Sequence, residues 1–184
     1  MASPSATPAP ASQGDVAIPD LLRVTTEYIE VEDRLRLSGE LPDGSTIVLW
    51  LTQRLVGRLV SHLCGWLEKQ TKAGAPVDLV QGFAQQAALA SLESQPKVQA
   101  ATGSQTCLVQ TIDLNGGEGF LVLVFKPDSQ GPAVTRLTMQ TQPLRQWLGI
   151  VLSQFRRAGW PLSVWPDWAI EARAPKAGPA ALIH

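Results

Sequence analysis

The hydrophobic period of the chain changes at Thr52, and the order of such changes limits the fold more than any other feature. Before this residue, apolar and polar side chains alternate over residues 22–31 and 34–41, as in half-buried strands. Pro42-Asp43-Gly44 has turn chemistry, because proline fixes φ and glycine accepts a positive φ, and it leads into the apolar run 45–51. These segments predict a three-stranded meander.

Two helices are expected after Thr52. Helical spacing predicts a first amphipathic helix whose apolar stripe consists of Leu55, Val56, Leu59, Val60, Leu63, Trp66 and Leu67. The second opens at Pro76 or Asp78, and we expect its core-facing stripe to be Val80, Phe83, Ala84, Ala87, Ala88 and Leu92. Because small side chains allow close approach, the pair is expected to form a helical hairpin packed on the sheet.

The second half of the chain predicts three more strands and a helix. The strands are residues 106–114, 119–125 and 133–141, with Asn115-Gly116-Gly117-Glu118 as the turn between the first two. A helix with Pro143 at its first position and Gly159 at its end carries an apolar stripe of Leu144, Trp147, Leu148, Val151, Leu152 and Phe155.

The predicted order is βββ-αα-βββ-α, followed by a short aromatic C-terminal strand or edge segment, and it indicates an α+β fold with antiparallel sheets. It is similar in element order alone to the head domains of DNA end-joining scaffold proteins and of centriole assembly proteins, where a helical pair interrupts an antiparallel sheet. We expect one globular domain over residues 20–172, between a disordered Ala/Ser/Pro-rich tail (1–19) and a flexible tail (173–184).

Charge and composition narrow the possible partners and location. Lys and Arg number 15 against 16 Asp and Glu, so the chain lacks a domain-wide basic footprint, and nucleic acid is an unlikely partner. There is no apolar run long enough to span a membrane and no basic or apolar signal region in residues 1–13, which predicts a cytoplasmic protein without membrane contact. Cys64 and Cys107 are expected to be buried free thiols, and we predict no metal.

No familiar catalytic or cofactor motif occurs in the sequence, so we predict a protein that is not an enzyme and holds no cofactor. The glycine cluster 116–119 lies between strands rather than before a helix, and it is interpreted as a hairpin turn. Four acidic residues gather near the end of the first strand: Glu27, Glu30, Glu32 and Asp33. A solvated turn would account for them, and so would a catalytic or cation-binding role.

Two residue sets are candidates for binding. Trp160, Trp165 and Trp168 fall close together between prolines, and tryptophan is enriched at binding hot spots. They are the predicted partner-binding residues, and the alternative is that their rings seal the end of the sheet. Arginine suits bidentate recognition of anions, and the possible anion-binding set, which would need to converge on one face, is Arg54, Arg58, Arg145, Arg156 and Arg157.

Three hypotheses about function follow. The first is a non-enzymatic interaction or assembly module, an accessory protein that binds a protein partner or a second copy of itself as a homodimer. Such a module predicts an unusually large exposed apolar patch. The second is a small-ligand binding domain, or an enzyme of another kind, with a pocket between the sheet and the Ala-rich second helix. The third is weak nucleic-acid binding through the helix arginines.

Overall fold

The computed structural model describes residues 18–172. The tail expected over residues 1–19 lies outside the described residues up to residue 17, and the tail expected over 173–184 lies wholly outside them. No helix within residues 18–172 is both long enough and apolar enough to cross a membrane.

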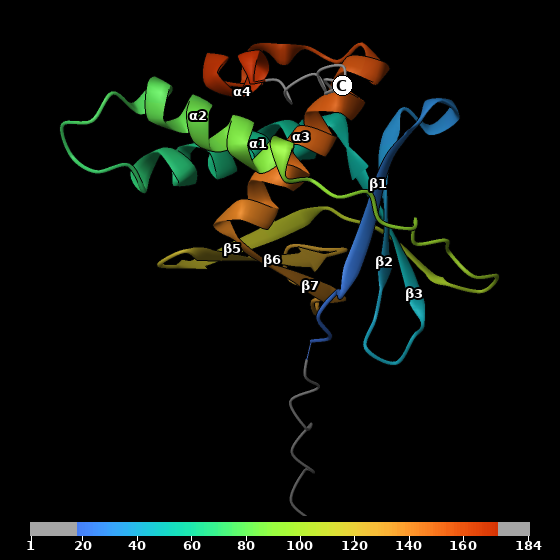
Figure 1. Ribbon diagram of the computed structural model, residues 1–184. Helices are drawn as coiled ribbons and strands as arrows, with labels where there is room; N and C mark the ends of the chain where they lie inside the picture. Colours follow the sequence, from blue (N-terminus) through green and yellow to red (C-terminus); the bar gives the residue numbers. More distant parts are fainter. Residues whose placement is uncertain (1–17, 173–184) are drawn as a thin grey trace, which may run out of the picture.

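The described residues form an α+β fold in which two sheets lie below a group of helices (Figure 1). The first sheet has the order β1-β2-β3-β4, with bounds Arg23–Ile29, Arg34–Glu40, Thr46–Thr52 and Gln105–Leu108. The second has the order β5-β6-β7, with bounds Thr111–Gly117, Phe120–Lys126 and Thr135–Gln140. The helices are α1 (Gln53–Lys69), α2 (Val77–Ala90), α3 (Thr141–Ala158) and the short α4 (Asp167–Glu171). The predicted α+β class is confirmed, and the order of elements agrees except that one predicted strand is two strands and the C-terminal segment is helical.

The pairing within the sheets is antiparallel with one exception. β4 runs parallel to β3, with Leu49 opposite Cys107, because the crossover through α1 and α2 returns the chain in the same direction. The single strand predicted over residues 106–114 is therefore two strands. Between them the chain passes from one sheet to the other: the Val109 N–H donates to the Trp50 carbonyl, and the Gln110 N–H donates to the Lys126 carbonyl.

The sheets also meet at their other edge, where the residues before β1 lie against β7. Asp20 forms a parallel bridge with Arg136, whose N–H donates to the carbonyl of Pro19 (3.0 Å) and whose carbonyl accepts from the N–H of Leu21 (2.8 Å). The two sheets are thus joined on both sides, and the core lies between them and the helices.

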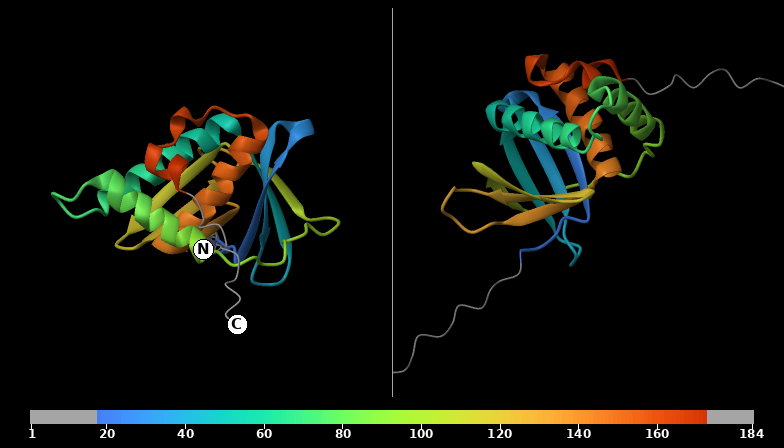
Figure 2. Two further views of the ribbon diagram at one scale, coloured as in Figure 1. Left: turned by 45° about the horizontal axis from the view of Figure 1, so that its top comes forward. Right: turned by 90° about the vertical axis from the view of Figure 1, so that its left-hand side faces the viewer.

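Two helices place their predicted apolar stripes in the core. Every residue of the α3 stripe is buried, and Trp147 Nε1 of this helix donates to Thr26 Oγ1 on β1 (3.0 Å). Helix α1 begins where the Thr52 side chain accepts from the Leu55 N–H, and it buries the predicted stripe except for the half-buried Leu55 and Trp66. Figure 2 shows α1, α2 and α4 gathered around α3.

Two local predictions require correction. The β5–β6 turn consists of Glu118 and Gly119 rather than residues 115–118, because Gly117 still pairs with Phe120 and Gly119 supplies the positive φ of 78°. The aromatic C-terminal segment forms a 3₁₀ helix at Leu162–Val164 and then α4, rather than a short strand.

Candidate functional site

The three C-terminal tryptophans lie in the hydrophobic core. Trp160, Trp165 and Trp168 are all buried, and Phe155 packs edge-on against the first two, with ring centroids 5.1 and 5.4 Å apart. Burial of the three rings is what the alternative, in which they seal the end of the sheet, predicts. A role for these residues in partner binding stays a prediction, and in this conformation their rings offer little surface to a partner.

The five candidate arginines differ in exposure and contacts. Arg54, Arg58 and Arg157 are exposed, and Arg156 donates to the Ile170 carbonyl (2.8 Å). Arg145, which belongs to the same predicted anion-binding set, is only 6% exposed. The reason is geometric: Arg145 precedes Leu152 by seven residues, so both side chains lie on nearly the same helix face.

The described residues show no activated nucleophile. Cys64 and Cys107 are buried free thiols, as expected. Burial raises the pKa of Cys64 to about 12, and the nearby Glu68 charge adds to this effect, so the thiol stays protonated at neutral pH. His62 is bonded through Nδ1 to the carbonyl of Arg58 in its own helix. Within residues 18–172, no three His, Cys, Asp or Glu side chains gather as metal ligands.

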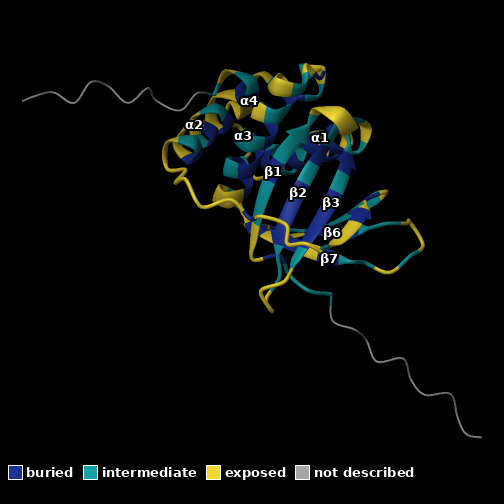
Figure 3. Ribbon diagram, turned by 90° about the vertical axis from the view of Figure 1, so that its right-hand side faces the viewer, coloured by how far each residue is buried: buried dark blue, intermediate teal, exposed yellow. Residues whose placement is uncertain are grey.

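Helix α2 presents an apolar face to solvent, which is the reverse of the predicted orientation. Of the stripe expected to face the core, only Ala88 is buried, whereas Phe83 is 64% exposed. Nine large apolar side chains are exposed in the described residues, and five of them belong to α2 or follow it directly: Val77, Leu79, Val80, Phe83 and Leu92. Exposed positions follow the length of α2 in Figure 3.

The face that α2 turns inward is polar. Gln81 and Gln85 are each only 2% exposed. Gln81 Nε2 donates to the Leu67 carbonyl (2.8 Å) at the end of α1, and its Oε1 accepts from Arg145 on α3. Gln85 Nε2 donates to the Arg145 carbonyl (2.8 Å). We call Gln81, Gln85 and Arg145 the polar seam, because these residues tie α2 to α1 and α3.

Arg145 carries the charge of the polar seam, and no carboxylate of residues 18–172 forms a salt bridge with it. Its guanidinium carbon lies 5.8 Å from the centre of the Trp168 ring, and burial lowers its pKa from the ordinary value. Its Nη1 and the Oε1 of Gln85 have no hydrogen-bond partner in the part of the chain that the structure describes. This packing of α2 buries polar groups, which costs free energy, and leaves apolar side chains in water. The stability of the monomer therefore accounts for only part of this arrangement.

Sequence reasoning missed this orientation although a signal was present. Gln81, Gln85 and Ala88 have the i, i+4, i+7 spacing of a buried stripe. Only the polarity of the two glutamines argued against burying this side of the helix. Gly149 is a second signal, because a side chain there would meet Leu89 of α2. The glycine lets α2 approach α3 closely.

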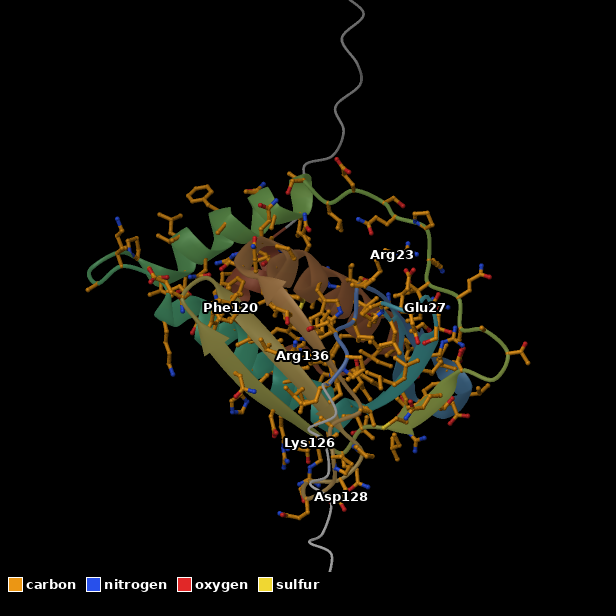
Figure 4. The ribbon with its side chains drawn as sticks, turned by 90° about the horizontal axis from the view of Figure 1, so that it is seen from below. Arg23, Glu27, Phe120, Lys126, Asp128 and Arg136 are labelled. Carbon is orange, nitrogen blue, oxygen red and sulfur yellow. The ribbon has the colours of Figure 1, made fainter. Side chains whose placement is uncertain are left out.

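A second candidate site is an open groove of about 820 Å³ between β1, β7, the first half of α3 and the loop after α2. The ligand hypothesis placed a pocket between the sheet and the second helix itself. The groove contains several apolar side chains, among them Leu22, Val24, Val98, Met139, Trp147 and Ile150. Two cations at its margin are already paired: Arg23 with Glu40 (2.7 Å), and Lys97 with Glu27 (2.7 Å). Figure 4 shows Arg23 and Glu27 on this side of the molecule.

Comparisons of the chain with protein-family models, with curated proteins and with solved structures find no match.

Proposed function

We propose that this chain is a non-enzymatic interaction module that binds a protein partner, or a second copy of itself, through the apolar face of α2. The single observation that carries the proposal is the inverted orientation of this helix, with Phe83 and Leu79 in solvent and two glutamines in the core. Contiguous apolar surface of roughly 300–600 Å² is the most that a typical monomer exposes, and such patches are often functional. An accessory role in the cytoplasm completes the proposal.

The test is site-specific photo-cross-linking in the cells that make the protein. A benzophenone side chain in place of Phe83 is expected to form covalent adducts with a protein. The same side chain in place of Phe120 serves as the control, because Phe120 is also exposed (44%) but belongs to β6 of the second sheet. Equal adduct formation at both positions, or none at position 83, would contradict the proposal.

The groove supports a second candidate function, the binding of a small apolar ligand. A volume of about 820 Å³ falls within the range of roughly 300–1,000 Å³ that is usual for ligand pockets. Here Val24→Trp, which fills the groove, is expected to abolish binding of an apolar fluorescent dye, whereas Phe83→Glu leaves it unchanged. The opposite pattern would assign the dye to α2 instead.

A further inference from the structure

We propose that the partner of α2 is the α2 helix of a second copy, packed antiparallel to it, so that the chain forms a weak homodimer. This inference rests on the proposed function and names the partner of the same site. At 100° per residue, the outward positions fall within an arc of about 100° opposite the polar seam. All are exposed: Leu79, Val80, Phe83, Ala87 and Ala90.

The distribution of side-chain size along this face favours an antiparallel pair. The bulky residues Leu79, Val80 and Phe83 lie in the N-terminal half, whereas the C-terminal half offers only alanines. A two-fold axis near the middle of α2 would set each bulky half on the small half of the other copy, with Phe83 beside Ala87 of the partner subunit. A two-fold interface must be self-complementary. The apolar face of α2 meets this condition because its bulky half fits its small half.

The charges at the two ends of α2 support the same direction. Asp78 is the only charged residue within α2, and at 100° per residue it lies about 150° from the centre of the apolar arc, on the side of the polar seam. Lys72 precedes the helix and Glu93 follows it; both are exposed, and neither forms an ion pair among the described residues. An antiparallel pair brings Lys72 toward Glu93 of the partner subunit at both ends, whereas a parallel pair would bring like charges together.

The size of the face sets the expected strength. The face consists of five exposed residues on a single helix, whereas a standard stable interface uses roughly 20–30 residues on each side. We therefore expect association in the micromolar range, with monomer and dimer both present at ordinary laboratory concentrations.

The first experiment measures molar mass by light scattering over a concentration series of the full chain. Phe83→Glu and Ala87→Glu are each expected to raise the dimer dissociation constant at least tenfold, because each places like charges near the axis. Phe120→Glu changes the net charge equally on a different surface and is expected to leave the constant unchanged. Circular dichroism spectra matching the wild type would show that the variants fold, as expected for substitutions at exposed positions.

The second experiment determines the direction of the helices. Nitroxide labels are attached to a cysteine at Gln86, in the middle of α2, or at Ala73, in the turn before it; both positions are exposed, and the native thiols are buried. In an antiparallel pair the distance between the two labels is short at position 86 and long at position 73. Short distances at both positions would mean a parallel pair and would overturn the proposed arrangement.

The experiments distinguish a wrong homodimer from a wrong interaction module. A monomer at all concentrations, or a dimer unaffected by Phe83→Glu, overturns the α2 homodimer. If the benzophenone at position 83 still forms adducts with a different protein, the interaction module stands with a heterologous partner. If it forms none, both proposals fail.

Discussion

Individual tryptophans in the aromatic end segment differ in what their ring nitrogens contact. Trp160 Nε1 donates to Asp33 Oδ1 (3.0 Å), and Trp168 Nε1 donates to Glu68 Oε1 (2.9 Å). Trp165 Nε1 is buried and has no hydrogen-bond partner among the described residues. Asp33 also accepts from the Tyr28 hydroxyl (3.0 Å) within the β1–β2 hairpin, so the Trp160–Asp33 hydrogen bond ties this turn to the end of α3.

This difference predicts unequal effects of replacing tryptophan by phenylalanine. Both replacements remove similar apolar surface, but only Trp160→Phe breaks a hydrogen bond. We expect Trp160→Phe to lower the free energy of unfolding by about 1–2 kcal/mol more than Trp165→Phe, because the carboxylate loses a donor. Urea unfolding measures both values. Equal losses would show that the Trp160–Asp33 hydrogen bond contributes nothing.

Glu27 predicts a dependence of stability on pH. It accepts hydrogen bonds from Lys97 (2.7 Å) and from Arg36 (2.9 Å), and these bonds lower its pKa below the ordinary 4.5. A lowered pKa stabilises the fold above pH 4.5, and this contribution disappears as the pH falls through the lowered value. Glu27→Gln should therefore cost about 1 kcal/mol at pH 7 and progressively less in acid. The control is Glu118→Gln in the exposed β5–β6 turn; a loss for Glu27→Gln that does not change with pH would contradict the linkage.

At the scale of elements, the sequence predicted where each helix lies better than which face it buries. The stripes of α1 and α3 were predictable because aliphatic side chains dominate one side of each. On α2 the apolar residues occupy more than one side, so a pattern of hydrophobicity alone cannot choose between orientations. The choice depends on Arg145 and on its contact with Gln81, which link elements 64 residues apart in the chain. Local hydrophobic periodicity therefore could not predict which face of α2 is exposed.

The polar seam predicts strong coupling between two of its residues. Gln81→Leu alone leaves the buried guanidinium of Arg145 without its side-chain acceptor, and we expect a loss of about 1–3 kcal/mol in the free energy of unfolding. Replacing both partners by apolar residues, Gln81→Leu with Arg145→Met, should restore most of that loss, because no unpaired buried charge remains. A double-mutant cycle in chemical denaturation measures this coupling. Additive losses would show that the two side chains act independently.

At the scale of the whole molecule, the two sheets depend on each other at both edges. One junction is covalent, where the chain runs from β4 through Val109 and Gln110 into β5. The other is not, since it rests on residues 19–21 lying against β7. There Asp20 accepts from Arg136 Nη2 (2.6 Å) and from Thr138 Oγ1 (3.1 Å). The hydrophobic pattern predicted the strands but not this closure, because a short segment such as 19–21 has no periodicity to detect.

Two truncations test whether the second junction stabilises the whole fold. Removing residues 1–17 leaves every contact between two described residues in place and serves as the control. Removing residues 1–20 also deletes the Pro19 carbonyl, which accepts from the Arg136 N–H, and the Asp20 carboxylate. We expect the longer deletion to lower the free energy of unfolding by about 2 kcal/mol relative to the shorter, since four hydrogen bonds are lost, two to the Pro19 carbonyl and two to the Asp20 carboxylate. Hydrogen exchange at the Arg136 amide should rise sharply only in the longer deletion. If exchange rises there while the free energy of unfolding is unchanged, the junction orders one edge of β7 without stabilising the fold.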